Sequence, residues 1–382
     1  MSSEFIILSA FLMLIAAAYV FLLAKFFAGW IGLALRQNEN IEPCTKVSVV
    51  VPARNEEQNI VSCLQGVLLQ DYPLSLFEVI VVDDFSEDAT AQLVLEFAQN
   101  HPEFNLKLIR LEGNFGKKAA LRQAYKLATG SLILNTDADC SHPAGWIKAM
   151  SQCFEQQNPV FISGPVLLKS DGNLWGVFQE LEFLSLIASG AGAIGAGVPI
   201  MCNGANLGFS SVALRQLNDD AMKSATASGD DVFLMLAMKQ QFGAQRITFL
   251  KNREAICETN ASATLRDYMN QRMRWVSKSS AYRDTFLIVT AISVFLINFS
   301  IVAATVGAFF VPVLLNLAIW LFAIKVLADL PLLWSFSRFA KREKFVIFIP
   351  VIEPLVVIYT VLAAIAGNLM NVSWKGRKVR PV

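Results

Sequence analysis

The sequence has few charged residues and only two histidines. Charged side chains make up 16% of its 382 residues, whereas about 25% is usual in soluble proteins. The net charge of +1 leaves no basic excess, so we expect no nucleic-acid partner. The cysteines include no CxxC pair and no zinc-like spacing, which excludes a cysteine–histidine zinc centre. We interpret the thiols as reduced and structural.

Apolar residues are in excess, at 54% of the chain, and they gather at its two ends. Residues 5–24 form an uncharged run long enough to cross a bilayer as a helix. A cleaved signal peptide has a shorter apolar region behind a basic start, so we predict an uncleaved transmembrane anchor over residues 1–35. Positive side chains follow the run at Lys25, Arg36 and Lys46. The positive-inside rule then places the next domain in the cytoplasm.

The C-terminal membrane region is predicted over residues 285–370. Two spans are expected at 285–310 and 313–336. Residues 345–367 form either a further span or a re-entrant helix, and the latter would keep the basic tail, residues 371–382, inside. The sequence therefore predicts an integral protein of the cell membrane with three or four spans.

One pair of opposite charges falls within the second of these C-terminal spans. Lys325 and Asp329 are four residues apart and share one face of a helix. We expect them to pair inside the membrane, either to pack helices or to serve a function.

Residues 46–283 have an ordinary globular composition and alternate strand-like with helical segments. Strands are predicted at 47–51, 79–82, 106–109 and 132–134, and helices at 56–70, 89–99 and 117–128. This alternation predicts an α/β fold with a mainly parallel sheet.

Paired acidic residues follow two of the predicted strands. Asp83 and Asp84 come after the second strand, and Asp137 and Asp139 come after the fourth. Ligands bind at the carboxyl ends of strands in such sheets. A single Asp there is often a turn or cap residue, but converging acids without histidine suit a hard cation, Mg²⁺ or Mn²⁺. Such a cation would supply the charge that a departing diphosphate needs.

The order of six short motifs carries a family resemblance over residues 46–278. The motifs are VPARNE at 51–56, DDFSEDAT at 83–90, GKKAAL at 116–121, DAD at 137–139, GDD at 229–231 and QRMRW at 271–275. In this order they resemble the motifs of the family-2 inverting glycosyltransferases, which have the GT-A fold and include cellulose and hyaluronan synthases. Ceramide glucosyltransferase is similar. The resemblance implies a cytoplasmic glycosyltransferase domain at 46–283 that uses a nucleotide-diphosphate sugar, a UDP-sugar by preference.

The resemblance implies that the first two motifs bind the donor. Arg54 and Glu56 would lie beside the base. Asp83 and Asp84 would contact the nucleotide sugar from the second turn, where Phe85 replaces the usual glycine.

The same resemblance implies the roles of the central acids. Lys117 would approach the nucleotide, although a lysine at a helix start is commonly a solvated turn residue. Asp139 would chiefly bind the metal, with Asp137 at the metal or the ribose. Asp231 would be the catalytic base that takes the proton of the acceptor hydroxyl. Asp230 stands where Glu is commoner, and two acids at a helix start also stabilise its dipole.

The last motif and one loop are assigned to the leaving group and the acceptor. Gln271, Arg274 and Trp275 would share one helix face, with Arg274 at the leaving diphosphate and Trp275 against acceptor sugar or lipid. Without the resemblance they would be membrane-interface anchors. The predicted acceptor loop comprises Asn203, Gly204 and Asn206. Its residues could equally form a turn.

Two stretches and the acceptor complete the sequence predictions. Residues 181–201 are apolar, but they lie between catalytic motifs that must share a compartment, so we predict a surface helix and a flexible loop.

The short membrane region favours a lipid acceptor over a membrane-associated glycan, while the QxxRW motif also occurs in processive polysaccharide synthases. A non-catalytic membrane scaffold with a transferase-like domain is the alternative of another class. The WKGR sequence at 374–377 resembles a motif of lipid-directed members.

Overall fold

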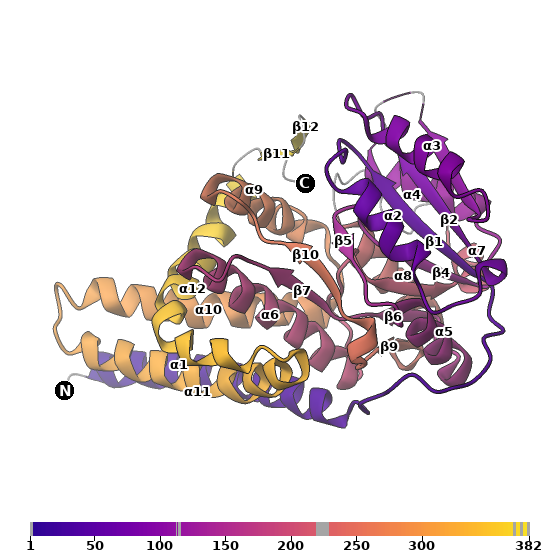
Figure 1. Ribbon diagram of the computed structural model, residues 1–382. Helices are drawn as coiled ribbons and strands as arrows, with labels where there is room; N and C mark the ends of the chain where they lie inside the picture. Colours follow the sequence, from indigo (N-terminus) through magenta and orange to yellow (C-terminus); the bar gives the residue numbers. More distant parts are fainter. Residues whose placement is uncertain are drawn as a thin grey trace. The chain divides into compact units, whose positions relative to one another are not determined.

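The computed structural model describes residues 3–111, 113, 116–218, 229–369, 372–374 and 377–379 (Figure 1). The chain divides into two compact units. The sheet unit comprises Leu33–Asp171 and Met201–Ala261, and the helical unit comprises Met1–Gly32, Gly172–Ile200 and Ser262–Val382. Two segments of the predicted glycosyltransferase domain, 172–200 and 262–283, therefore cluster with the apolar helices.

The sheet unit is built on a seven-stranded sheet with the order β3-β2-β1-β4-β8-β6-β9. Its strands are β1 (Val47–Ala53), β2 (Phe77–Asp83), β3 (Leu106–Arg110), β4 (Leu132–Asn135), β6 (Phe161–Ser163), β8 (Leu207–Ser210) and β9 (Ile247–Phe249). Strand β8 runs antiparallel to β4 and β6, and the other neighbouring pairs are parallel. This arrangement confirms the predicted α/β fold with a mainly parallel sheet.

Helices cover both faces of this sheet. They are α2 (Ile60–Leu68), α3 (Thr90–Asn100), α4 (Lys117–Leu127), α5 (Trp146–Gln157), α7 (Ser211–Arg215) and α8 (Asp230–Phe242), with short 3-10 turns η1 (Leu74–Leu76), η2 (Ala244–Arg246) and η3 (Arg253–Ala255). Val47, Val49 and Val51 share one core with α2, α3 and α5, whereas α4 packs on the opposite face, where Tyr125 contacts Phe209. Both faces are buried, which explains the uninterrupted apolar runs of β1 and β2.

A second, three-stranded sheet completes the sheet unit. Its order is β5-β10-β7, with β5 (Cys140–Ser141), β10 (Cys257–Asn260) and β7 (Val166–Lys169). Strand β10 pairs antiparallel with β5 and parallel with β7. This small sheet fixes the segment that directly follows Asp139.

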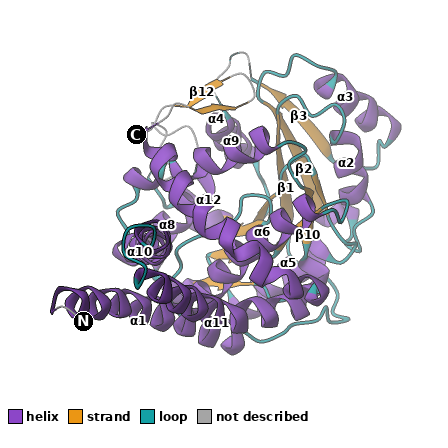
Figure 2. Cartoon of the chain, turned by 90° about the vertical axis from the view of Figure 1, so that its left-hand side faces the viewer, coloured by secondary structure: helices purple, strands orange, loops and turns teal. Residues whose placement is uncertain are grey.

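The helical unit is formed by long apolar helices. Its elements are α1 (Ser3–Gly32), α6 (Leu174–Gly195), α9 (Leu265–Val276), α10 (Thr285–Gly307), α11 (Leu314–Ala340) and α12 (Ile349–Leu369), the 3-10 turns η4 (Ser279–Ala281) and η5 (Glu343–Phe348), and the hairpin of β11 (Val372–Trp374) and β12 (Arg377–Val379). Helices α1 and α11 lie side by side in Figure 1 and in Figure 2. Of the predicted basic tail, Asn371, Lys375, Gly376 and 380–382 lie outside the described residues.

Five helical segments within the described residues are long and apolar enough to cross a membrane. They are Ser3–Gly32, Leu174–Gly195, Thr285–Gly307, Leu314–Ala340 and Glu343–Gly367. Four of them match the predicted membrane segments. The fifth, Leu174–Gly195, falls in the stretch for which the sequence predicts a surface helix and a flexible loop.

That prediction is wrong, because α6 is a buried helix. Within its most apolar stretch, 78% of the residues are buried, and it packs against α1 and α11. The crossing with α1 is very close: a Cβ atom on Gly192 would lie 2.3 Å from the Phe26 carbonyl oxygen, and one on Gly29 would lie 2.1 Å from the Gly192 carbonyl oxygen. Glycines at such a contact let two backbones approach, as they do in membrane helix pairs.

A buried polar cluster joins three of these helices. Lys325 Nζ lies 2.8 Å from Asp329 Oδ2, as predicted, and also contacts Glu353 on α12. From α1, the Tyr19 hydroxyl donates a hydrogen bond of 2.5 Å to Asp329 Oδ1. The four side chains fix α1 and α12 against α11, since none of them could be left unpaired in an apolar interior.

Candidate functional site

The loops after β1 and β2 are joined by hydrogen bonds at the carboxyl end of the sheet. The strands are in register, with Ala53 opposite Asp83. The amide of Asn55 donates to Ser86 Oγ at 3.0 Å, and the amide of Glu56 donates to Thr90 Oγ1 at 2.8 Å. Hydrogen bonds therefore join the two predicted donor-binding motifs to each other.

Arg54 lies beneath the second turn. It is 7% exposed, and its Nη1 donates to the carbonyl oxygens of Asp84 at 2.8 Å and Phe85 at 3.3 Å. Phe85 has φ of +59°, the left-handed conformation that favours glycine. The turn thus keeps a glycine-type backbone although phenylalanine occupies the position, and Arg54 holds its carbonyls.

Asp83 and Asp84 have different partners. Asp83 is buried, and it accepts a hydrogen bond of 3.0 Å from the Ser86 amide and one of 3.3 Å from Arg110 Nε. This is the turn role that the sequence left open. Asp84 Oδ1 accepts a hydrogen bond of 3.0 Å from the Gly116 amide, which links the second motif to the loop before Lys117. Asn114 and Phe115 of that loop lie outside the described residues.

Lys117 lies among three carboxylates. Its Nζ is 2.5 Å from Asp137 Oδ1. Burial lowers the pKa of Lys117, but the charges of Asp137, Asp230 and Asp231 outweigh burial and raise the pKa above its ordinary value. The lysine is therefore paired with the predicted metal motif and lies within electrostatic range of the predicted catalytic base.

Asp137 is half-buried and Asp139 is partly exposed to solvent, and Glu56 is near enough to affect the charge of Asp139. The pKa of Asp139 is raised, first because protein atoms shield its carboxyl and then because of the negative charges of Asp137 and Glu56. Two carboxylates and Glu56 thus concentrate negative charge at the end of β4, where a cation would relieve their repulsion.

Three side chains outside the predicted motifs, those of Thr136, His142 and Thr259, surround this acidic turn. Thr136 Oγ1 and His142 Nε2, which bracket it, are 2.8 Å apart. The Thr259 hydroxyl, on β10, donates a hydrogen bond of 3.2 Å to Asp139 Oδ2. Histidine is rare in this chain, and that rarity is the only feature of the sequence that could have pointed to His142. Nothing in the sequence points to Thr259, because its partner Asp139 lies 120 residues away.

The donor set fits a hard divalent cation that is also bound by its substrate. No group of three His, Cys, Asp or Glu side chains within the described ranges is arranged to hold a metal ion. Asp137 and Asp139 supply carboxylate oxygens, and Mg²⁺ is commonly bound by one or two carboxylates with substrate phosphates and water completing the shell. The site therefore fits a cation shared with a diphosphate.

Asp231 lies in the first turn of α8 and contacts the predicted acceptor loop. Its Oδ2 accepts a hydrogen bond of 3.1 Å from the Gly204 amide. The preceding residue of the helix, Asp230, follows Gly229, whose φ is +85°. Ser228 lies outside the described residues. The structure thus brings the predicted base and Gly204 together.

The two asparagines of that loop have structural partners. Asn203 Oδ1 accepts a hydrogen bond of 3.0 Å from the Ala205 amide. Asn206 is 0% exposed, and its amide nitrogen donates to the carbonyls of Pro165 and Ala255 at 2.8 and 2.7 Å while its oxygen accepts from Trp146 Nε1 at 2.9 Å. For Asn206 the structure supports a structural role rather than contact with an acceptor.

The QRMRW motif lies on α9, in the helical unit. The most buried residue of the motif is Arg272, which is 2% exposed and is not one of the residues assigned a role from the sequence. It pairs with Glu182 of α6. The rings of Tyr268 and Trp275 lie 4.5 and 4.3 Å from its guanidinium carbon. Burial lowers the pKa of Arg272, but the charge of Glu182 outweighs burial and raises that pKa above its ordinary value, so Arg272 stays charged.

The other motif side chains are less buried than Arg272. Gln271, Arg274 and Trp275 are half-buried, and Gln271 accepts a hydrogen bond from Arg272. Trp275 therefore packs against Arg272, and its predicted contact with an acceptor stays a prediction. The Arg272–Glu182 pair was not predicted, because Glu182 lies in the stretch expected at the surface.

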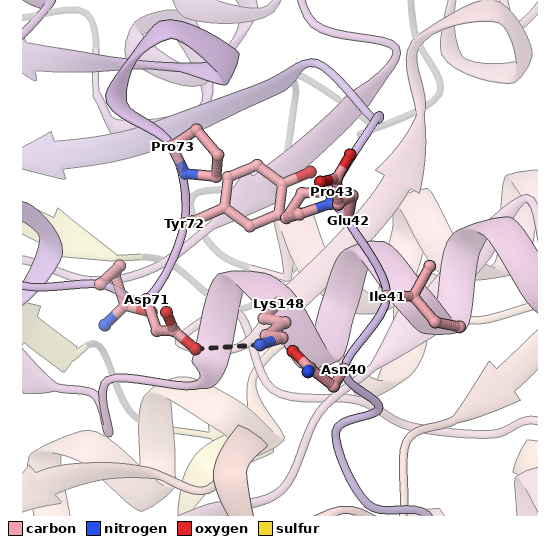
Figure 3. Close-up of a pocket in the computed structure, with 9 residues that line it drawn as sticks. Asn40, Ile41, Glu42, Pro43, Asp71, Tyr72, Pro73 and Lys148 are labelled. Atoms are coloured by element: carbon pink, nitrogen blue, oxygen red, sulfur yellow. Dashed lines mark hydrogen bonds and ion pairs between the residues drawn. The ribbon is translucent and has the colours of Figure 1, made fainter.

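A polar pocket of about 640 Å³ lies elsewhere in the sheet unit (Figure 3). Most of its wall comes from the segments that precede β1 and β2. The pocket therefore lies toward the amino ends of these strands, whereas the predicted site lies at the carboxyl ends. Lys148 Nζ and Asp71 Oδ2 in its wall are 3.0 Å apart, and the Tyr72 hydroxyl donates to the Thr45 carbonyl. None of the predicted site residues lines this pocket.

Comparison with known proteins finds glycosyltransferases among the proteins similar to this chain. Residues 48–213 match the family model described as "Glycosyl transferase family 2". The chain is 29% identical over 255 residues to an N-acetylglucosaminyltransferase of Rhizobium meliloti, covering 64% of this chain and 58% of the relative. It is 33% identical over 118 residues to an undecaprenyl-phosphate 4-deoxy-4-formamido-L-arabinose transferase of Photorhabdus laumondii, covering 31% of this chain and 36% of that one.

A solved structure has the same fold along nearly the whole chain. It is the mannosyltransferase PcManGT of Pyrobaculum calidifontis, solved with GDP-Man and Mn²⁺, at a TM-score of 0.59 and 19% identity, covering 94% of this chain and 98% of that one. The chain spans less than two thirds of the length of the first curated relatives it matches. Residues 48–213 are thus similar to the glycosyl transferase family 2 model, and the chain has a GT-A-like α/β fold.

Proposed function

We propose that this chain is a membrane-bound inverting glycosyltransferase that moves a sugar from a nucleotide-diphosphate sugar to a lipid acceptor. The observation that carries the proposal is the contact of Lys117 Nζ with Asp137 Oδ1, 2.5 Å apart, on a lysine whose charge Asp230 and Asp231 also stabilise. This supports one site at the carboxyl end of the sheet for both the predicted metal motif and the predicted base motif.

In the proposed mechanism each side chain has one task. Asp231 takes the proton of the acceptor hydroxyl as that oxygen attacks the anomeric carbon. Asp139 and Asp137 would hold Mg²⁺ or Mn²⁺, and when bound the cation neutralises charge on the diphosphate. Lys117 adds positive charge beside the nucleotide, and Arg274 steadies the departing diphosphate. The donor side would be formed by Arg54, Glu56, Asp83 and Asp84, as the order of the motifs along the sequence implies.

Support for the donor and the cation comes from similar proteins. The mannosyltransferase of like fold holds GDP-Man and Mn²⁺, and we propose a divalent cation here. Relatives named as N-acetylglucosaminyltransferases match more than 60% of this chain, so a UDP-sugar is our preferred donor.

Support for a lipid acceptor comes from the helices and from two relatives. One relative is named as an undecaprenyl-phosphate transferase and another, from Dictyostelium discoideum, as a dolichyl-phosphate β-glucosyltransferase. The five apolar helical segments would keep such an acceptor near the enzyme. Basic residues after the first run support a cytoplasmic catalytic domain. A relative named as a poly-β-1,6-N-acetyl-D-glucosamine synthase of Staphylococcus epidermidis keeps processive synthesis as the alternative.

The test is sugar transfer by membranes that carry the full chain, with radiolabelled UDP-sugars and GDP-mannose. Asp231→Asn should lower transfer by about 10² to 10⁴, the contribution of a general base, while the neighbouring Asp230→Asn should lower it much less. Near-normal transfer by Asp231→Asn would show that this residue is not the base.

The same incubation decides the acceptor. A single labelled product that partitions into organic solvent supports transfer to a lipid, whereas a ladder or a high polymer supports processive synthesis. Donor binding by the unaltered chain without hydrolysis or transfer would support the non-catalytic scaffold instead.

A further inference from the structure

Strand β10 contacts the acidic turn in two ways. Its Thr259 is opposite Cys140 in the β5–β10 pair, and Glu258 is opposite Ser141. Cys140 directly follows Asp139, so this ladder fixes the backbone at the end of the turn. The Thr259 side chain then returns to Asp139 itself, with 3.2 Å between its Oγ1 and Asp139 Oδ2.

The two acids of the turn have partners of different kinds. Asp137 Oδ1 is bound by the charged Lys117. Asp139 is bound by the neutral hydroxyl of Thr259 on Oδ2 and by a thiol, Cys140 Sγ, 3.6 Å from Oδ1. A thiol is a weak donor, so the hydroxyl is the stronger of these two neutral contacts. A hydroxyl orients a carboxylate without neutralising it, and the remaining lone pairs of Asp139 stay open for a cation.

We infer that Thr259 is a positioning residue, which orients the Asp139 carboxylate for binding a divalent cation. The inference rests on the proposed function. Hydrogen bonds to a ligating carboxylate fix its orientation before the metal arrives, and their loss typically weakens metal binding by about 10- to 100-fold. The strand supplies the rigidity, because a threonine on a paired strand is held in place by the ladder on either side.

The experiment compares Thr259→Val with Thr259→Ser in the full chain in detergent. Valine keeps the shape and the strand preference of threonine but removes the hydroxyl, and serine keeps the hydroxyl. Thr248→Val is the matched control, because Thr248 is also a strand threonine, on β9, and its hydroxyl contacts Gln157 away from the acids. Free Mn²⁺ is measured by electron paramagnetic resonance with UDP present, and sugar transfer is measured as a function of Mn²⁺ concentration.

Thr259→Val should weaken Mn²⁺ binding about tenfold, with the rate at saturating Mn²⁺ close to that of the unaltered chain. Thr259→Ser should stay within about threefold, and Thr248→Val should be unchanged. Unaltered Mn²⁺ binding by Thr259→Val, or equal loss in Thr259→Val and Thr259→Ser, would overturn the inference while leaving the proposed function intact. If the unaltered chain neither binds Mn²⁺ nor transfers sugar, the proposed function fails and the inference fails with it.

Discussion

Glu78 is a buried acid on β2 whose charge should contribute strongly to the stability of the sheet unit. It is 3% exposed and accepts hydrogen bonds from Ser48 Oγ at 2.8 Å, from the Thr129 amide at 2.8 Å and from Thr129 Oγ1 at 2.6 Å. Lys107 Nζ lies 2.7 Å from its other oxygen. Burial raises the pKa of Glu78, but these donors together outweigh burial and lower it to about 2.

The magnitude follows from linkage between folding and proton binding. A carboxyl with an ordinary pKa of 4.5 that falls to about 2 in the fold corresponds to about 3 kcal/mol of stability. Lys107 is 49% exposed, so solvent screens its share, and we expect about 2 kcal/mol in practice. Because the folded pKa is depressed, this stability is present above about pH 4.5 and is lost as the pH falls towards 2.

The perturbation is Glu78→Gln, which keeps the shape and one acceptor oxygen but cannot ionise. At pH 7 it should lower the free energy of opening of β1 and β2 by about 2 kcal/mol. The assay is urea-dependent hydrogen exchange of peptides from these strands, read by mass spectrometry between pH 7 and pH 3. Lys107→Met is the control for the screened ion pair and should cost less than about 1 kcal/mol.

The pH dependence is the decisive part of the result. The difference between the unaltered chain and Glu78→Gln should shrink as the pH falls from 4.5 towards 3, because the unfolded chain then protonates this glutamate while the folded chain still holds it ionised. A difference that stays constant between pH 7 and pH 3, or one below about 0.5 kcal/mol at pH 7, would refute the reasoning.

Two further substitutions test the left-handed turn and the α9 anchor. Phe85→Gly should be more stable than Phe85→Ala by about 1 kcal/mol. Both substitutions remove the ring, but a φ of +59° is unfavourable for alanine and not for glycine. Urea unfolding compares the two variants, and equal stability would contradict the backbone argument. Glu182→Gln should destabilise the helical unit by about 3 kcal/mol, because it leaves Arg272 buried without its counter-charge. Thermal unfolding in detergent measures that loss, and an unchanged midpoint would contradict it.

Local patterns were sufficient to predict the strands and helices that carry the acids. The predicted strand at 79–82 is β2, and the predicted helix at 117–128 is α4, Lys117–Leu127. Both depend on neighbours in the sequence, since apolar runs and turn residues act over a few positions. The position of the acids at the carboxyl edge then follows from parallel pairing alone.

Contacts between distant residues could not be predicted in this way. Tyr19 binds Asp329 across 310 positions of the sequence, and Arg272 binds Glu182 across 90. An apolar helix such as α6 has the same composition whether it faces solvent, lipid or other helices. Its place is decided by the glycine contact with α1, which no local pattern reveals.

The buried position of α6 has a consequence for dividing the protein. The chain passes between the two units at four points, after Gly32, Asp171, Ile200 and Ala261. Removing the first helix would leave α6 inside the remaining chain with its glycine face uncovered, an apolar surface that invites aggregation. During synthesis α1 likewise has no α6 to pack against until roughly 140 further residues have been made, which takes on the order of ten seconds at the rate of translation. No single cut therefore separates the sheet unit from the helical unit, and if the proposed membrane spans are correct, purification will require detergent or lipid from the first step.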